Sequence, residues 1–419
     1  MNKIKIFDNG IRLVFEKNDK DVLAANILFY VGSENETKQQ EGYSHFIEHM
    51  MFKSCEKFST EEIMDNLTKL GADYNAYTSR TVTRYTFKCL PENFEKCFEI
   101  YSSMLMNPKF LKEELDKERE VVIEEMKQCD DNPVEVLYKQ TINNYFEGTS
   151  FAHDELGTEE IISNVSSKEL FEYKNKFYVP ERCVVSVAGN MEFDDVVKIV
   201  EKNLFAGVKN KRNPVLAKFG EFSANITKKY EVVERDDNQA NVCVHIKSVP
   251  ANSNLKYVAD IYTSILGNSQ NSKLFKRIRE SLGLVYTIFA SNEMRINSGE
   301  IFIVFGTRPK NIEKAMTEIK NVINMMADYG ISAEELDRAK TWKRSCMMFA
   351  LETNSDIAEA NGTNLFCYNK TISPSEIIDG YQKVSLNEVI DFAKRIASEE
   401  IFNVVAVGKN LKIEEIKQF

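Results

Sequence analysis

The chain has 419 residues, of which 43% are hydrophobic and 28% are charged, so it is long enough to bury a large core and is not a disordered protein. At roughly 100–200 residues per domain, this length predicts two or three domains. The formal net charge of −10, from 54 basic and 64 acidic residues, argues against a nucleic-acid-binding protein, because such proteins present a basic face.

The eight cysteines are scattered along the chain, and no two of them have the C-x-x-C spacing. We therefore expect free thiols and no disulfide framework. The N-terminal residues run directly into a strand pattern without the apolar core of a signal peptide, and the longest apolar stretches, such as 23–31, are too short to span a membrane. These features predict a cytoplasmic protein without a membrane segment.

The first half opens with a predicted β-hairpin, in which strands 3–7 and 11–16 flank a turn at 8–10. The Asn-Gly pair in that turn supplies the positive φ angles that a tight hairpin needs. A third strand over 23–31 precedes residues 43–52, which are apolar almost all round and therefore predict a buried helix. The other elements expected in this half are helices over 59–71, 94–106 and 111–129 and strands over 74–78, 85–90 and 183–189.

The second half resembles the first. Residues 110–116 are similar to 331–337 at an offset of 221, and the strand at 184–190 is similar to 403–409. Two copies of one α+β unit explain this, with antiparallel-rich sheets and helices packed on one face, since strands cluster ahead of helices. The polar, basic stretch near the midpoint reads as a linker. We therefore expect a domain over 1–208, a linker over 209–221 and a homologous domain over 222–419.

The sequence H-F-I-E-H at 45–49 carries the strongest chemical signal, and the chain has only four histidines. His45 and His49 are one helical turn apart, so both imidazoles leave the same face and can bind one ion. Glu48 lies on that face, where a carboxylate can hold a metal-bound water; this is the inverted zinc motif H-x-x-E-H. The alternative is a pair of core histidines, but two buried histidines and a glutamate are costly to bury without a metal.

A catalytic zinc ion normally takes a third protein ligand and leaves one position for water. Candidates lie on the helix expected over 111–129, where Glu118 and Glu125 are two turns apart and share a face, while Glu124 points about 100° away. An acid-rich helix is also typical of a solvated surface, so spacing alone does not select the ligand.

The motif at 45–49, followed 76 positions later by Glu125 (125 − 49), resembles the pitrilysin-type inverzincin peptidases, the family of insulin-degrading enzyme and the mitochondrial processing peptidase. The resemblance covers nearly the whole chain and matches the family's shorter bacterial members. It implies that one zinc ion per chain is bound by His45, His49 and Glu125, with Glu48 as the general base and Glu118 supporting the site.

Two further segments match the family's substrate-binding residues. Asn75 and Ala76 fall in its substrate-pairing edge strand, and Arg279 and Tyr286 fall in the segment that carries a substrate-binding arginine and tyrosine. Arg279 would donate to a peptide carbonyl, and the Tyr286 hydroxyl would stabilise the oxyanion of the transition state. Without the resemblance, Arg279 would be interpreted as an ordinary surface arginine and Tyr286 as a packed tyrosine.

The repeat indicates that only the first copy holds a metal. The offset of 221 places Ala339 opposite Glu118 and Cys346 opposite Glu125, and the second half has no second H-x-x-E-H motif. The second domain is therefore expected to be non-catalytic and to supply a substrate-binding wall.

Together these features predict a zinc metalloendopeptidase that hydrolyses extended, unfolded peptides inside a chamber. The resemblance implies that a homodimer, or a heterodimer with a related chain, closes the chamber. The leading alternative is a non-catalytic or co-catalytic subunit of a heterodimeric processing peptidase, although the intact motif argues against a subunit that has lost its ligands. A structural zinc site would typically add cysteine ligands, and none lies at ligand spacing near the motif.

Overall fold

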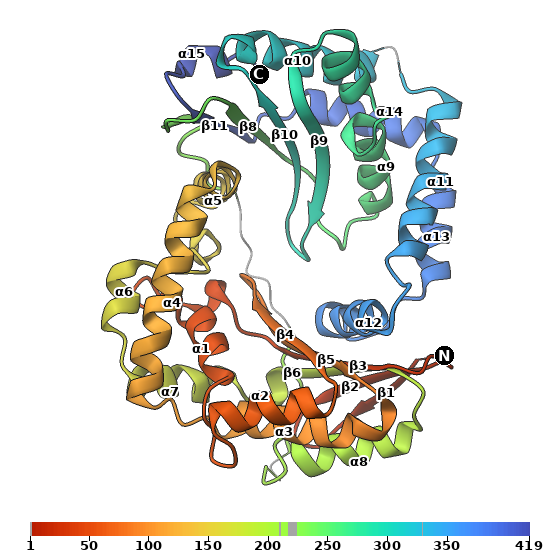
Figure 1. Cartoon of the computed structure of the whole chain (residues 1–419). Coiled ribbons are helices and arrows are strands. Elements are labelled where there is room, and N and C mark those ends of the chain that lie inside the picture. Colours follow the sequence, from red (N-terminus) through yellow and green to blue (C-terminus); the bar gives the residue numbers. More distant parts are fainter. Residues whose placement is uncertain (1, 209–210, 217–223, 329) are drawn as a thin grey trace. The chain divides into compact units, whose positions relative to one another are not determined.

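The structure is a computed structural model that describes residues 2–208, 211–216, 224–328 and 330–419. Its internal contacts divide the chain into two compact units, coloured along the sequence in Figure 1. Unit 1 comprises Met1–Met126, His153–Lys218 and Phe349–Ile372, and unit 2 comprises Lys127–Ala152, Phe219–Met348 and Ser373–Phe419. Each unit contains one sheet and several helices, which confirms the predicted α+β class.

The sheet of unit 1 has six strands in the order β1-β2-β6-β3-β5-β4. Neighbouring strands are antiparallel except for β2 and β6, which run parallel. The predicted hairpin is present between β1 and β2, and Gly10 in its turn has a φ of +97°. The strands are β1 (Lys3–Ile6), β2 (Arg12–Lys17), β3 (Leu23–Phe29), β4 (Asp73–Thr78), β5 (Thr83–Cys89) and β6 (Cys183–Gly189).

The four helices that the sequence predicted for this unit begin and end within two residues of the expected positions. In the second of them, Ser59 accepts a hydrogen bond from the Glu62 amide, and Glu62 accepts one from the Ser59 amide, which is the capping box expected from the sequence. The helices are α1 (Tyr43–Met51), α2 (Thr60–Lys69), α3 (Phe94–Met106), α4 (Lys112–Asp131), α6 (Glu159–Asn164), α7 (Ser167–Phe177), α8 (Phe193–Asn203) and α12 (Asn354–Tyr368).

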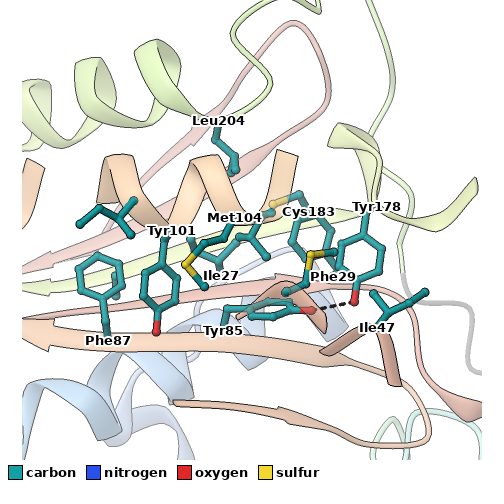
Figure 2. Packing of buried hydrophobic residues seen from close by; sticks show 14 of the residues in the cluster. Ile27, Phe29, Ile47, Tyr85, Phe87, Tyr101, Met104, Tyr178, Cys183 and Leu204 are labelled. Carbon is teal, nitrogen blue, oxygen red and sulfur yellow. Dashed lines mark hydrogen bonds between the residues drawn. The ribbon is translucent and has the colours of Figure 1, made fainter. Parts of the chain in front are cut away.

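Aromatic and aliphatic side chains form the core between this sheet and its helices (Figure 2). Phe29 of β3 packs on the Tyr178 ring with centroids 4.6 Å apart, and Phe87 of β5 packs on Tyr101 of α3 at 4.8 Å. The hydroxyls of Tyr85 and Tyr178 hydrogen bond at 2.9 Å, so neither buried polar group is left without a partner. This core fixes the sheet against which α1 packs.

Unit 2 repeats the arrangement of unit 1. Its five strands have the order β7-β11-β8-β10-β9, and the parallel pair, β7 and β11, takes the place of β2 and β6. The strands are β7 (Tyr230–Glu234), β8 (Ala240–Lys247), β9 (Val285–Met294), β10 (Gly299–Thr307) and β11 (Phe402–Gly408). The helices are α5 (Pro133–Tyr145), α9 (Lys256–Gly267), the π-helix Phe275–Ser281, α10 (Ile312–Asp328), α11 (Ala333–Phe349), α13 (Pro374–Lys383), α14 (Leu386–Ala397) and α15 (Ile413–Ile416).

One helix from each half of the sequence packs on the sheet of the other half. Helix α12 lies against β2, β3 and β6, on the face opposite α3 and α8 (Figure 1), and α5 lies against β8 and β11. In β11, Val404 and Ala406 face the main core of unit 2, whereas Val405 and Val407 face α5. Each sheet is therefore covered on both faces, and the exchanged helices add a third layer to the predicted two-layer units.

The compact units thus differ from a division into two contiguous segments. Helix α5 comes from the first half of the sequence but belongs to unit 2, and α12 comes from the second half but belongs to unit 1. Of the segment expected as a linker, residues 211–216 contain no helix or strand, while 209–210 and 217–221 lie outside the described residues.

We expect Gly362→Leu to destabilise the protein, because α12 approaches the sheet closely at this position. A Cβ atom on Gly362 would lie 3.0 Å from Leu28 Cδ1 and 3.0 Å from Ser186 Cβ. Overpacking of this kind typically costs about 1–3 kcal/mol. Thermal or urea unfolding would measure the loss, with Ser355→Leu at an exposed position of the same helix as the control. Equal stability of the two variants would contradict the close packing of α12.

Candidate metal centre

The start of α1 is fixed by a buried carboxylate and a glycine. Gly42, which precedes the helix, has a φ of +91°, and a Cβ atom there would lie 2.5 Å from the Leu156 carbonyl oxygen. The Glu36 carboxylate accepts hydrogen bonds from the amides of Gly42 at 2.8 Å and Ser44 at 2.7 Å. Burial raises the pKa of Glu36 to about 8, although these hydrogen bonds act in the opposite direction. The helix that carries the motif is therefore anchored at its first turn.

The motif helix is buried, as its apolar sequence predicted. Phe46 and Ile47 are fully enclosed, and His45 and Glu48 are only 9% and 8% exposed. Figure 2 shows Ile47 among the core side chains of unit 1. The polar residues of the motif are consequently held on a helix with little freedom to shift.

Two histidines of α1 and one glutamate of α4 converge. The Nε2 atoms of His45 and His49 are 3.2 Å apart, and Glu125 Oε2 lies 3.7 Å from the first and 3.5 Å from the second. One ligand atom from each residue lies within 4.8 Å of the others, and within the described part of the chain this is the one such cluster of potential metal ligands. The three residues that the resemblance implied are thus brought together.

Glu118 lies beside this cluster and contacts it through His49. Its Oε1 accepts a hydrogen bond from His49 Nδ1 at 2.9 Å, and its Oε2 pairs with the Lys53 ammonium. Burial alone would raise the pKa of Glu118, but the hydrogen bonds from His49 and Lys53 outweigh it and lower the pKa. An Nδ1–H that is held by a carboxylate directs the Nε2 lone pair of His49 toward the cluster, which is the usual arrangement around a metal-binding histidine.

The two imidazoles have opposite electrostatic environments. Burial, together with His49, lowers the pKa of His45 to about 4. Burial also disfavours the charged form of His49, but the hydrogen bonds to Glu118 and Glu125 and the charge of Glu48 raise its pKa to about 9. The cluster therefore favours one positive charge between the rings, and a cation bound by both Nε2 atoms would take the place of the His49 proton. Two nitrogen donors and one carboxylate oxygen fit zinc and leave a position for water.

Glu48 is held by the last residue of the neighbouring edge strand. Thr78 Oγ1 donates a hydrogen bond to Glu48 Oε2 at 2.7 Å. Burial raises the pKa of Glu48, and the hydrogen bond from Thr78 and the charge of His49 only partly oppose this shift. A carboxylate with a raised pKa beside a candidate metal site is suited to accept a proton.

Asn75 and Ala76 lie in β4, the edge strand of the six-stranded sheet. Asn75 is exposed, Ala76 is half-buried, and Asn75 Oδ1 accepts a hydrogen bond from the Ala76 amide at 2.9 Å. Among the described residues, neither side chain hydrogen bonds to the histidine–glutamate cluster. Their assignment to substrate binding stays a prediction.

Arg279 and Tyr286 belong to unit 2. The Arg279 guanidinium lies over the Phe275 ring, 4.7 Å from its centroid, and the Tyr286 side chain is 42% exposed. The Tyr286 hydroxyl accepts a hydrogen bond from Arg308 Nε at 2.7 Å. The roles that the resemblance implied for Arg279 and Tyr286 also stay predictions.

Sequence reasoning missed three residues that position the cluster. Thr78 was expected only as the end of a strand, and Lys53 and Glu36 were not singled out. Lys53 had a detectable signal, because it is a basic residue only four positions after His49. Glu36 and Thr78 come from other elements, and no spacing in the sequence connects them to the motif.

The remaining histidines have no role in the cluster. His245 is fully buried and stacks between the rings of Tyr145 and Phe302, with centroids 3.8 and 4.2 Å away. Burial holds the pKa of His245 well below its usual value. His153 hydrogen bonds to the backbone of Ser33. Both fit a structural role.

If the chain hydrolyses peptides as the resemblance implies, we expect Thr78→Val to shift the pH dependence of that reaction. The Thr78 hydroxyl stabilises the ionised form of Glu48 and so lowers its pKa. Removing the hydroxyl raises the Glu48 pKa further. With Glu48 as the general base that the resemblance implies, the acidic limb of the kcat/KM profile then moves to higher pH, because a general base acts only when deprotonated. Thr78→Ser keeps the hydroxyl and should retain the wild-type profile. Identical profiles for wild type and Thr78→Val would show that the hydrogen bond has no effect on the base.

Two family models match consecutive parts of the chain. The model described as "Insulinase (Peptidase family M16)" matches residues 12–159, and the model described as "Peptidase M16 inactive domain" matches residues 164–341. The first segment contains the whole histidine–glutamate cluster, and the second contains Arg279 and Tyr286.

Relatives match over almost their entire length. The chain is 30% identical to the uncharacterized zinc protease YmxG of Bacillus subtilis over 394 residues, which cover 94% of this chain and 95% of the relative. It is 29% identical to an uncharacterized zinc protease of Rickettsia bellii over 393 residues, 93% of each.

Two solved structures share the fold. A protease from Helicobacter pylori matches with a TM-score of 0.87 at 21% identity and covers 97% of this chain and 99% of its own. A "peptidase M16 inactive domain" from Pseudomonas fluorescens matches with a TM-score of 0.88 at 17% identity, over 98% of each chain. At these identities the likeness concerns the fold alone.

Two other expectations concern the cysteines and membrane-spanning segments. All eight cysteines are free, and five of them are buried. Among the described residues, the helices are all too short or too polar to cross a membrane.

Proposed function

The chain belongs to the insulinase family of peptidases (peptidase family M16), and we propose that it is a zinc metallopeptidase that hydrolyses peptide bonds in extended, unfolded segments. The observation that carries the proposal is the convergence of His45, His49 and Glu125 beside the buried carboxylate of Glu48. In this proposal the three residues bind one zinc ion per chain.

The bound ion supplies Lewis-acid activation of a water molecule and of the scissile carbonyl. Glu48 accepts the proton of the attacking water on its carboxylate and then donates it to the leaving amine. Thr78 holds one carboxylate oxygen of Glu48, which fixes the direction of the other. Glu118 holds the His49 ring through Nδ1, so that Nε2 keeps its orientation.

The substrate would bind as an additional strand along β4. This strand forms one edge of the sheet, and its last residue contacts Glu48, so a peptide paired with β4 would run toward the reacting groups. Main-chain hydrogen bonds would supply most of the affinity, which favours broad specificity for unfolded segments. Asn75 and Ala76 would contact that peptide. Arg279 would donate to a peptide carbonyl, and the Tyr286 hydroxyl would stabilise the oxyanion of the transition state.

The expected partner is a second peptidase chain, and the expected location is the cytoplasm. A homodimer, or a heterodimer with a related chain, would enclose the substrate, with the second domain as the non-catalytic wall. Sedimentation analysis combined with activity measurements tests this, and a monomer that cleaves peptides at full rate would remove the dimer. The free cysteines are compatible with the cytoplasm.

Zinc analysis and cleavage of a quenched fluorescent basic peptide test the proposed function. We expect one zinc ion per chain, loss of cleavage on treatment with a chelator, and recovery when zinc is restored. If the chain binds zinc but cuts nothing, it is better described as one subunit of a two-chain peptidase, and mixing it with a related chain would show this. If it neither binds zinc nor cuts, the proposal is wrong.

A further inference from the structure

Unit 2 contains a pocket of about 490 Å³ between α9 and α11. Its walls include Ser264 and Ile265 from α9, Ala339 and Trp342 from α11, and Ser269, Asn271 and Ser272 from the loop that follows α9. No residue of the histidine–glutamate cluster contributes to it, because that cluster lies in unit 1.

The pocket occupies the place in unit 2 that the metal centre occupies in unit 1. The two sheets have matching strand orders, and α9 and α11 correspond to α1 and α4. At the offset of 221, Ala339 stands where Glu118 stands (118 + 221). Aligning the last residues of α1 and α9, Met51 and Gly267, gives an offset of 216 and places Ser264 opposite Glu48. Two shorter side chains, Ala339 and Ser264, thus stand opposite Glu118 and Glu48, and both line the pocket.

The wall combines an apolar surface with a buried hydroxyl that has no hydrogen-bond partner among the described residues. The Trp342 side chain is 42% exposed, and its Nε1 donates a hydrogen bond to Asn268 Oδ1 at 3.5 Å. Ile265 and Ala339 add apolar surface beside the indole. Ser272 is only 2% exposed, and its Oγ has no hydrogen-bond partner among the described residues. Because a buried hydroxyl without a partner is unfavourable, a polar group of a ligand would be stabilised there.

One carboxylate at the pocket, that of Asp337, has no ion-pair partner among the described residues. Glu334 pairs with Arg338 at 2.6 Å, and Glu335 pairs with Lys273 at 2.8 Å. Asp337 also lines the pocket, and no ion pair involves it in the part of the chain that the structure describes. The pocket is therefore complementary to a ligand that carries an apolar ring and a single positive charge.

We propose that this pocket is a second peptide-binding site, which takes an aromatic side chain that is adjacent to a basic residue in the substrate. The ring packs against Trp342, Ile265 and Ala339, a main-chain group of the peptide hydrogen bonds to Ser272 Oγ, and the basic side chain pairs with Asp337. That the ligand is a peptide rests on the proposed function; the site itself rests on the pocket.

The chain has a single tryptophan, so its fluorescence reports on this pocket directly. We would titrate the full-length Glu48→Gln variant with N-acetyl-phenylalanyl-arginine amide and record tryptophan emission. We expect a saturable change in emission, and several-fold weaker binding of the matched peptide that carries glutamate in place of arginine. Asp337→Asn should remove most of the difference between the two peptides.

Two matched substitutions separate binding in the pocket from unspecific quenching. Ser345 is half-buried and lines the pocket, so Ser345→Leu should fill it and abolish the saturable change. Thr317→Leu makes a similar change at an exposed position on α10 and should bind as the parent does. A linear change without saturation, or unaltered binding to Ser345→Leu, would overturn the second site. Because this readout requires no cleavage, its failure is distinguishable from a failure of the proposed peptidase, which is tested by zinc content and hydrolysis.

Discussion

Replacement of Glu48 by glutamine should lower kcat by about 10²–10⁴-fold while zinc stays bound, because the amide keeps the shape of the side chain but cannot accept the proton of the attacking water. Glu48 is 8% exposed and hydrogen bonds to Thr78, and glutamine can accept the same hydrogen bond. Zinc content and steady-state cleavage of a quenched peptide measure the two properties separately.

Glu120→Gln is the matched control for this substitution. Glu120 is exposed on α4 and is absent from the histidine–glutamate cluster, so the variant should cleave at the wild-type rate. Comparable activity of Glu48→Gln and wild type would exclude Glu48 as the base. Loss of zinc from Glu48→Gln would instead show that this residue holds the metal.

The second prediction with a large expected effect compares zinc binding after substitution of the two glutamates that share a face of α4. We expect Glu125→Gln to lose zinc and activity, because Glu125 Oε2 is the carboxylate oxygen that lies within 4 Å of both Nε2 atoms. Within the cluster, Glu118 contacts Nδ1 of His49 and neither Nε2 atom, so Glu118→Gln should weaken zinc binding by about 10–100-fold and regain activity at excess zinc. Competition with a chelating dye measures both affinities. The reverse ranking would make Glu118 the ligand.

Much of unit 1 follows from local sequence. The Asn-Gly turn gave the hairpin of β1 and β2, the Ser59–Glu62 capping box began α2, and the apolar run at 43–52 became the buried helix α1. The spacing of His45 and His49 alone ensured that both rings leave one face of that helix. These features depend on backbone geometry within a few residues, which the sequence states directly.

Local sequence did not identify the third residue of the cluster. Spacing on α4 left Glu118 and Glu125 equivalent, and the family resemblance chose between them. In the structure, Glu125 faces both Nε2 atoms and Glu118 faces the opposite nitrogen of His49. The two glutamates share a face, so the position of α1 along the axis of α4 decides this, and that position depends on how the two helices pack.

The sequence by itself determined the class of fold, the internal repeat, the metal-binding motif and the loss of that motif from the second copy. Only the tertiary structure decided that α5 and α12 each cover the sheet formed by the other half of the sequence, that Thr78 holds Glu48, and that a pocket lies between α9 and α11. The physical reason is the separation of the interacting residues along the chain. Hydrogen bonds within a turn or helix join near neighbours, so the local sequence determines them. Contacts between distant segments depend on shape complementarity, which the spacing of residues does not encode.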